Sequence, residues 1–361
     1  MVKRTKFYSV HKALNAKIVE FAGYEMPISY SSIISEHKIV RSSVGVFDVS
    51  HMGQIFVKGA NALQFVQKVT VNDASKLFKG RVQYSAFCFE DGGIVDDLLV
   101  YCISETEYLL VVNASNITKD FEWLEKNNQE SVELTNLSDE YSLLAIQGPF
   151  SQKVVEMFFE QPVSLEYYHF TNITKNGVEY IVSRTGYTGE LGYELYFKSD
   201  EATAVAVWDK VFECGKEYSI SPIGLAARDT LRLEMGFCLY GNDIDSTTNP
   251  LEAGLGWITR INKGAFIGKD SLLKSKEEGL KRKLTPLICE DRSIPRHGYD
   301  VVVKGVKVGT VTSGALSPVL DKPIALAYVD SSYLDSDAQL CISIRGKEVP
   351  ARIVKLPFIE R

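Results

Sequence analysis

The clearest structural signal in this sequence is Gly92-Gly93-Ile94-Val95-Asp96-Asp97-Leu98-Leu99-Val100-Tyr101, a glycine pair followed by two aspartates and an apolar run. Neighbouring side chains of a strand point to opposite faces, so Asp97 shares a face with Tyr101 while Asp96 points the other way. At most one of the two carboxylates can therefore face a given cleft. Gly-Gly-Asp-Asp is also an ordinary turn sequence before a buried strand. Only its occurrence together with other motifs along the chain favours a functional interpretation.

The chain around this strand alternates between strands and helices. We expect strands at 55–57, 98–103, 108–113 and 141–146, and helices at 35–41, 60–69 and 116–126. The clearest helix is expected at 201–214, with Asp200 as its N-cap and Gly215 as its C-terminal stop. This rhythm predicts α+β structure with antiparallel sheets.

Beyond about residue 250 the pattern changes to short strands separated by Gly, Pro and Asp. Strands are expected at 301–304, 308–312, 324–329, 340–344 and 351–354. Such a run predicts a β-barrel or jelly-roll module. With 361 residues in all, the chain is long enough for two or three domains.

Composition excludes several classes of function. A formal net charge of -6 gives no overall attraction to nucleic acid, so a DNA or RNA partner is not expected. No segment approaches the roughly 18 apolar residues that span a membrane, and the basic start lacks the apolar core of a secretory signal, so we expect a cytoplasmic protein. The six cysteines and five histidines are dispersed, which predicts buried reduced thiols and no metal site.

The segment 183–194 places Gly186, Gly189 and Gly192 three residues apart, with strand-like runs on both sides. The strand-to-helix setting of a dinucleotide fingerprint is absent, so a nicotinamide or flavin site is not supported. Two interpretations remain open. The segment is either a plain tight hairpin or a loop that closes over a flat ligand, with Tyr187 and Glu194 pointing inward.

A second candidate segment runs from Pro222, which is well placed to open a helix, to Glu234. Arg228 and Arg232 lie four apart on one helix face, which fits a surface ion-pair ladder. Alternatively, an arginine and a nearby glutamate in one cleft suit a heterocycle with both donor and acceptor edges. The acidic segment 242–245 lacks the further ligands that calcium needs and is assigned to a turn.

These segments, taken together, resemble one family. They are Phe21-Ala22-Gly23-Tyr24-Glu25-Met26-Pro27, Phe47-Asp48-Val49-Ser50-His51-Met52-Gly53, Gly92 to Asp97, Val182 to Glu190, Gly224 to Glu234, Tyr240-Gly241-Asn242-Asp243, and Ser313-Gly314 with Ser317-Pro318. In that order, from about residue 6 to residue 358, the pattern resembles the aminomethyltransferases, the T-proteins of glycine cleavage systems. Departures are Tyr24 in place of Trp, Leu191 in place of an acidic residue and Ala226 in place of Gly.

The resemblance implies a three-domain α+β cloverleaf with tetrahydrofolate in a central channel. Its first domain would be discontinuous, comprising 1–53 and 137–247, and would bind folate. A ferredoxin-like second domain at 54–136 would be inserted into it, and 248–361 would form a jelly-roll-like β-barrel. Both of the first two domains would be antiparallel α+β structures.

The resemblance also implies a reaction and its residues. An aminomethyl group on the dihydrolipoyl arm of lipoylated H-protein would yield ammonia and 5,10-methylenetetrahydrofolate, with tetrahydrofolate as co-substrate, no metal and the lipoyl group supplied by the partner. Asp97 matches the catalytic aspartate of the family. The matched folate-binding positions are Met52, Tyr84, Val111, Asn113, Tyr187, Glu194 and Arg228.

Two other readings compete with this one. Folate-binding accessory proteins share the architecture without transferase activity, although the cysteine motif that typifies them is not found here. A scaffold without enzymatic activity would require Asp97, Tyr187, Glu194 and Arg228 to be structural residues only.

Overall fold

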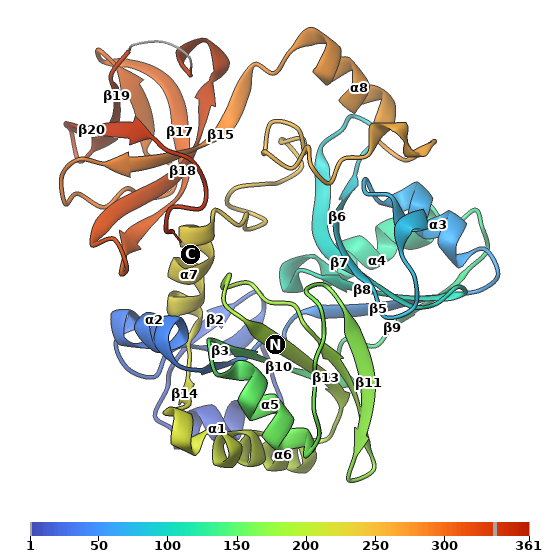
Figure 1. The fold of residues 1–361 in the computed structure, drawn as a ribbon. Coiled ribbons are helices and arrows are strands. Elements are labelled where there is room, and N and C mark those ends of the chain that lie inside the picture. Colours follow the sequence, from blue (N-terminus) through green and yellow to red (C-terminus); the bar gives the residue numbers. More distant parts are fainter. Residues whose placement is uncertain (1, 335–337, 361) are drawn as a thin grey trace. The chain divides into compact units, whose positions relative to one another are not determined.

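The computed structural model describes residues 2–334 and 338–360, and its chain divides into two compact units (Figure 1). The first unit comprises Met1–Val66, Ala74–Tyr84 and Leu98–Asp229, and the second comprises Gln67–Asp73, Ser85–Asp97 and Thr230–Arg361. The predicted α+β class with a C-terminal barrel is confirmed. The three-domain boundaries stay a prediction.

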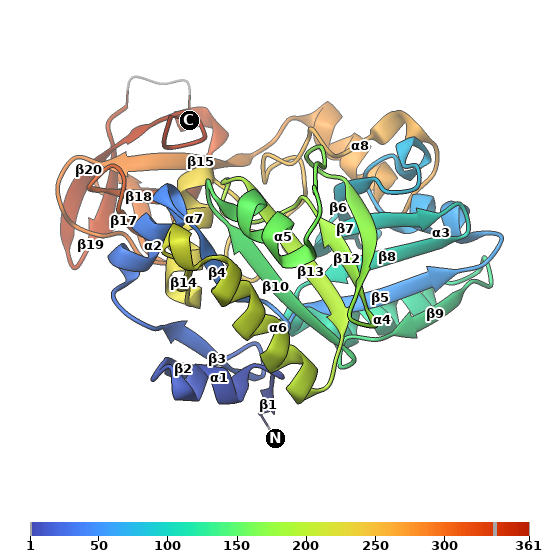
Figure 2. The same ribbon diagram turned by 60° about the horizontal axis from the view of Figure 1, so that its bottom comes forward.

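A six-stranded sheet forms the centre of the first unit. Its strand order is β11 (Phe170–Lys175), β12 (Val178–Ser183), β13 (Gly192–Lys198), β10 (Tyr141–Gln147), β4 (Gly45–Asp48) and β14 (Ser221–Pro222). Helices α5 (Ser151–Phe159) and α6 (Glu201–Cys214) cover one face (Figure 2), where Trp208 and Phe158 join the core. The helix at 201–214 is confirmed, since Asp200 accepts a hydrogen bond from Thr203 N at 2.8 Å and Gly215 follows the last turn.

A five-stranded sheet carries the segment that contains the aspartate pair. Its order is β6 (Val82–Cys88), β7 (Ile94–Ser104), β8 (Glu107–Val112), β5 (Gly53–Lys58) and β9 (Glu133–Asn136), with α3 (Ala62–Val69) and α4 (Ile117–Lys126) as its helices. The strands and helices predicted between residues 55 and 126 are confirmed. Strand β7 begins in the second unit and continues into the first.

The N-terminal region adds a small sheet to the first unit. Its order is β1 (Lys3–Arg4), β3 (Tyr24–Ser29) and β2 (Lys17–Phe21), and helices α1 (Tyr8–Ala13) and α2 (Ile33–Ser42) belong to the same region. The side chain of Ser32 caps α2 by accepting from Ser35 N at 3.1 Å. Short 3-10 helices lie at Ala74–Lys76, Ala114–Asn116, Lys216–Tyr218, Ile261–Lys263 and Ser331–Tyr333.

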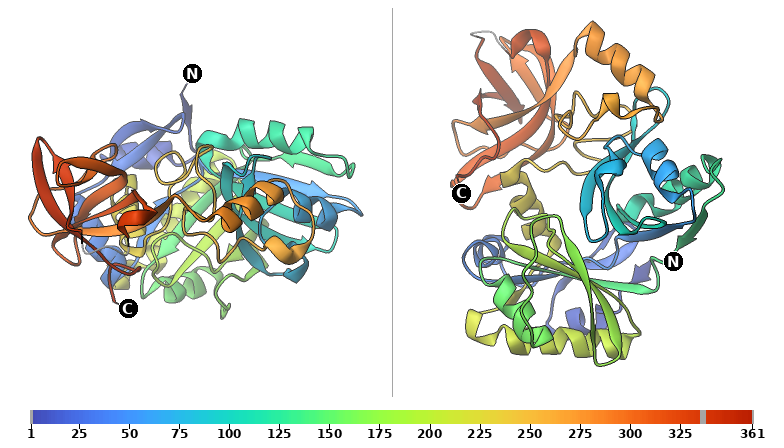
Figure 3. Two further views of the ribbon diagram at one scale, coloured as in Figure 1. Left: turned by 90° about the horizontal axis from the view of Figure 1, so that it is seen from above. Right: turned by 45° about the vertical axis from the view of Figure 1, so that its right-hand side comes forward.

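The second unit contains a closed antiparallel barrel (Figure 3). Around the barrel the strands are β15 (Arg282–Cys289), β18 (Lys322–Asp330), β17 (Val306–Ser317), β16 (Asp300–Val303), β19 (Leu340–Ile344) and β20 (Lys347–Ile353). Alternate apolar side chains such as Val301, Val311 and Ala327 fill the interior, as the period of a strand requires. Helix α8 (Lys269–Glu278) precedes the barrel.

Pro222 does not open a helix, so that prediction is wrong. Residues 221–222 form the edge strand β14, which pairs in parallel with β4, and helix α7 (Leu225–Met235) begins three residues later. An edge strand accepts proline because its outward position needs no N–H donor. Gly224 directly precedes the helix. Its N donates to Glu36 Oε2 at 2.8 Å, and a Cβ added to it would lie 2.3 Å from Ile28 O.

Candidate active site

The loop between β12 and β13 folds back onto Gln147 of β10. A Cβ added at Gly186 or Gly192 would lie 2.0 or 2.3 Å from the end of the Gln147 side chain, so a larger residue at either position would displace that amide. The Thr188 hydroxyl donates to Gln147 Oε1 at 2.9 Å, and Arg41 Nη1 donates to Thr188 O at 2.7 Å. Strands β12 and β13 form an antiparallel hairpin, and two of the three spaced glycines in its loop lie close to one buried amide. The alternative in which this loop closes over a flat ligand stays a prediction.

Tyr187 lies on this loop and is paired with Arg228 of α7. The guanidinium carbon of Arg228 lies 4.7 Å from the centroid of the Tyr187 ring, which is a cation–π distance, and both side chains are half-buried. Burial, together with the positive charge of Arg228, lowers the pKa of His51 to about 3. His51 is therefore a neutral imidazole in the neighbourhood of Arg228.

Glu194 sits on β13, opposite Ser183 of β12. Its Oε2 accepts hydrogen bonds from the Thr185 hydroxyl and, at 3.2 Å, from the Tyr196 hydroxyl. Burial raises the pKa of Glu194, and these two hydrogen bonds together with the charge of Arg228 offset part of that effect. Among the described residues, the other oxygen, Oε1, accepts no hydrogen bond, and it can therefore receive a donor from a ligand.

Three further predicted site residues meet at one end of the five-stranded sheet. Strands β5 and β8 are antiparallel and pair Gly53 with Val112, so Met52 precedes β5 where Val111 and Asn113 mark the end of β8. Val111 is buried, whereas Met52 and Asn113 are half-buried. Tyr84 lies on β6 of the same sheet and is also half-buried.

Asp97 belongs to the second unit, in the first part of β7. Asp96 is fully buried and Asp97 is half-buried, as the alternation along the strand predicts. Burial raises the pKa of the Cys238 thiol, and the carboxylates of Asp243 and Asp97 raise it further. Asp97 therefore lies near Cys238 within this unit.

The start of β7 is held by its main chain. Ile94 N donates to Thr248 O at 3.0 Å and to Asp245 O at 3.2 Å, while the Tyr240 hydroxyl donates to Ile94 O at 3.1 Å. A Cβ added at Gly93 would lie 2.1 Å from Ser246 O, so the turn before Asp97 packs against main chain. These contacts fix the direction in which the strand starts.

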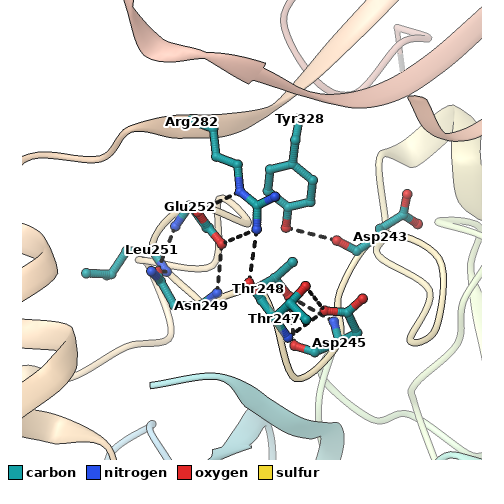
Figure 4. A network of polar contacts seen from close by, with 9 residues as sticks. All are labelled: Asp243, Asp245, Thr247, Thr248, Asn249, Leu251, Glu252, Arg282 and Tyr328. Atoms are coloured by element: carbon teal, nitrogen blue, oxygen red, sulfur yellow. Dashed lines mark hydrogen bonds and ion pairs between the residues drawn. The ribbon is translucent and has the colours of Figure 1, made fainter. Parts of the chain in front are cut away.

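The loop against which this turn packs is itself held by hydrogen bonds (Figure 4). Arg282 donates to Glu252 Oε1 and to Thr247 O, both at 3.0 Å. The Asp245 side chain accepts from Thr247 N at 2.7 Å, and the Tyr328 hydroxyl donates to Asp243 O at 2.9 Å. Figure 4 shows these side chains converging on the loop from the barrel strands and from the preceding turn.

Arg232 is a core residue, so the surface ladder considered for the two arginines is wrong for this one. It is 1% exposed, and its Nη1 lies 2.6 Å from Asp243 Oδ2. The segment 242–245 is a turn, as predicted, and its Asp243 serves as the partner of a buried guanidinium. Across residues 2–334 and 338–360 there is no group of three His, Cys, Asp or Glu that could hold a metal ion.

The structure thus gathers Tyr187, Glu194 and Arg228 in one neighbourhood of the first unit, and Met52, Val111 and Asn113 at one end of a sheet. Sequence reasoning missed the partners of Glu194. The period of a strand was an available signal for Tyr196, which lies two residues after Glu194 on the same face. Gln147 gave no such signal, because its role depends on contacts with a distant loop.

Comparison with known proteins covers nearly the whole chain. Residues 7–263 match the family model of the GCVT N-terminal domain, and residues 282–360 match that of the glycine cleavage T-protein C-terminal barrel domain. The aminomethyltransferase of Halothermothrix orenii is 51% identical over 359 residues, covering 99% of this chain and 100% of the relative. That of Flavobacterium psychrophilum is 52% identical over 363 residues, with 100% of both chains covered.

A solved structure agrees with these matches. The crystal structure of the glycine cleavage system aminomethyltransferase T from Bartonella henselae superposes with a TM-score of 0.92 at 33% identity, covering 99% of this chain and 98% of that one. No helix in the described part of the chain is long and apolar enough to cross a membrane.

Proposed function

We infer the reaction from one premise: the chain belongs to the glycine cleavage T-protein family. It is an aminomethyltransferase of the glycine cleavage system. We propose that the aminomethyl group arrives on the dihydrolipoyl arm of H-protein. Two nitrogens of tetrahydrofolate bond to the methylene carbon as its bonds to nitrogen and sulfur break, so ammonia and the free dihydrolipoyl thiol leave and 5,10-methylenetetrahydrofolate is the product.

The observation that carries the proposal is the free Oε1 of Glu194 beside the charge of Arg228. One edge of a pterin carries amino and ring N–H groups, which donate hydrogen bonds to a carboxylate oxygen. Its carbonyl accepts a hydrogen bond from a guanidinium. Glu194 supplies the acceptor and Arg228 supplies the donor. The surfaces that line the pterin in this scheme belong to Met52, Tyr84, Val111, Asn113 and Tyr187.

Asp97 is the proposed catalytic residue. Positive charge develops on the transferred carbon as its bond to nitrogen breaks, and an anionic carboxylate beside it stabilises that charge. The same carboxylate can orient the folate amines toward the carbon. No strong base is needed, so positioning is the main task, and it can account for on the order of 7 to 11 kcal/mol of a barrier.

The test is spectrophotometric formation of 5,10-methylenetetrahydrofolate from tetrahydrofolate and aminomethyl-loaded H-protein. We expect Asp97→Asn to lower turnover by at least about 100-fold while tetrahydrofolate affinity is kept. Glu194→Ala should mainly weaken binding, by about 2 to 5 kcal/mol, because it removes a buried charged partner.

Asp96→Asn is the matched control, since it makes the same chemical change one residue earlier on the opposite face of the strand. Circular dichroism establishes that both variants fold. Near-normal turnover in Asp97→Asn would refute the catalytic assignment, and a selective loss in Asp96→Asn would transfer the role to that residue. Tetrahydrofolate binding without any product in the wild-type protein would contradict the proposed reaction.

A further inference from the structure

Four buried hydroxyl groups form a connected set, two of which contact one oxygen of Glu194. We call Tyr101, Ser183, Thr185 and Tyr196 the hydroxyl cluster; each is 2% exposed or less. The Tyr101 hydroxyl lies 2.9 Å from that of Tyr196 and 3.3 Å from that of Thr185, and Thr185 lies 2.9 Å from the Ser183 hydroxyl. The cluster therefore forms a connected set whose two inner members, Thr185 and Tyr196, contact Glu194 Oε2.

The directions of these hydrogen bonds follow from proton counting. An ionised carboxylate only accepts, so Tyr196 donates its hydrogen to Oε2, whereas the single hydrogen of Thr185 is shared between Oε2 and the Ser183 hydroxyl oxygen. The oxygen of the Tyr196 hydroxyl is then left to accept from the Tyr101 hydroxyl. The hydroxyls of Thr185 and Tyr196 favour the ionised carboxylate against the opposing effect of burial.

Tyr101 is well placed to hold this arrangement. Its ring packs against Tyr196, with centroids 5.6 Å apart at 72°, and against Phe170, with centroids 5.3 Å apart at 57°. It comes from β7, whereas Tyr196 and Glu194 come from β13, so it ties one sheet of the first unit to the other. A buried tyrosine packed on two rings keeps its hydroxyl at one place.

We propose that Tyr101 is a positioning residue for the folate site: through Tyr196 and Thr185 it fixes Glu194 Oε2 and leaves Oε1 as the oxygen that accepts the pterin N–H edge. This inference rests on the proposed function. It adds that both hydroxyl donors occupy Oε2, so the ligand engages a single oxygen of the carboxylate.

The experiment is calorimetric titration of the full chain with tetrahydrofolate under anaerobic conditions at a series of pH values. Affinity falls as the pH falls through the pKa of Glu194, because the protonated carboxyl accepts less strongly. Tyr196→Phe removes one donor, which should weaken binding about 10-fold near neutral pH and move the acid limb upward by about one pH unit. Tyr101→Phe acts one bond further away and should weaken binding about 3-fold, with a smaller shift in the same direction.

Tyr193→Phe is the matched control. Tyr193 is 1% exposed, adjoins Glu194 on β13 but faces the other way, and its hydroxyl donates to Val163 O at 3.0 Å. This variant loses a buried hydroxyl hydrogen bond of similar length outside the cluster. It should keep tetrahydrofolate affinity within about 2-fold and leave the acid limb in place.

Two further measurements separate positioning from general destabilisation. In steady-state assays, Tyr101→Phe should raise the KM for tetrahydrofolate and leave kcat within about 2-fold, because Asp97 is untouched. In a double-mutant cycle, Tyr101→Phe with Tyr196→Phe should weaken binding by less than the product of the single effects. Equal affinity and pH dependence in Tyr101→Phe and Tyr193→Phe would overturn the inference.

Glu194→Gln distinguishes failure of the inference from failure of the proposed function. It should weaken tetrahydrofolate binding by about 30-fold or more and abolish the acid limb. If Glu194→Gln behaves in this way while Tyr101→Phe behaves as the control does, only the positioning role falls. If Glu194→Gln binds as the wild-type protein does, the assignment of Glu194 itself is wrong.

Discussion

Asp243→Asn should lower the stability of the second unit by about 3 to 5 kcal/mol, because it leaves a buried guanidinium without its counter-charge. Arg232 and Asp243 are 1% and 0% exposed at their side chains, and the closest atoms are 2.6 Å apart. Arg232 also donates to Phe237 O at 2.9 Å and to the Ser313 hydroxyl at 2.8 Å, so its position is fixed by neutral acceptors as well. Asparagine keeps the size of the side chain but removes its charge.

Substituting Arg232 as well allows the coupling energy between Arg232 and Asp243 to be measured. Arg232→Met replaces the guanidinium with an apolar side chain of similar reach, and Asp243 then keeps Leu239 N, at 3.0 Å, and the Thr312 hydroxyl as donors. Once the buried positive charge is gone, Asp243→Asn should cost less than it does in the wild-type background. We expect a coupling energy of about 2 kcal/mol or more in the double-mutant cycle.

The assay is urea unfolding followed by circular dichroism, with each transition fitted separately. Lys3 and Asp139 provide the matched surface pair, since they lie 2.8 Å apart but are 55% and 73% exposed. Their coupling in Lys3→Met and Asp139→Asn should stay below about 1 kcal/mol. A buried coupling no larger than the surface coupling would refute the argument that burial, rather than distance, sets the energy of the Arg232–Asp243 pair.

Three further predictions concern the supports of the fold. Lys263→Met removes an ammonium that donates to three main-chain carbonyls at 2.5 to 2.7 Å and should cost about 2 to 4 kcal/mol in urea unfolding, whereas Lys269→Met, with one such bond, should cost less than about 1. Gly93→Ala forces a Cβ onto a carbonyl and should cost at least about 2 kcal/mol and impair transfer, while Gly256→Ala has room and should be nearly neutral; equal effects would contradict the close-contact argument. His51 stays neutral when folded because burial and a nearby guanidinium lower its pKa to about 3. The unfolded state therefore binds a proton first as pH falls below about 6.5, and wild-type stability drops by up to about 1.4 kcal/mol per pH unit from there toward pH 3. His51→Leu should flatten that slope, and an unchanged slope would show that other groups cause it.

Much of the fold could be read from the sequence wherever a local signal was complete. The helix at 201–214 was predictable to the residue because Asp200 caps its start, Gly215 ends it and apolar residues recur at core spacing between them. Pro222 shows where local signals fail. Proline suits the first turn of a helix and an edge strand equally well, and pairing with β4 decided the outcome.

The site was less accessible to the same reasoning. Glu194 and Arg228 could be singled out because charged residues beside a glycine loop and on a helix carry chemistry of their own. Tyr101 could not, since its hydroxyl reaches Tyr196 only through the contact between two sheets that are separate in the sequence. Arg232 and Asp243 are joined by a turn whose path no local pattern specifies.

The way in which Glu194 and Arg228 are stabilised bears directly on recognition. Among the described residues no ion pair joins them: Glu194 is satisfied by two hydroxyls and Arg228 stacks on Tyr187. A direct ion pair would use up the donor and the acceptor that a pterin needs, and the ligand would have to break it on binding. Two hydroxyls hold the carboxylate of Glu194 in place without cancelling its charge. Its Oε1 therefore remains available to a donor edge of a ligand, and binding at that oxygen incurs little reorganisation.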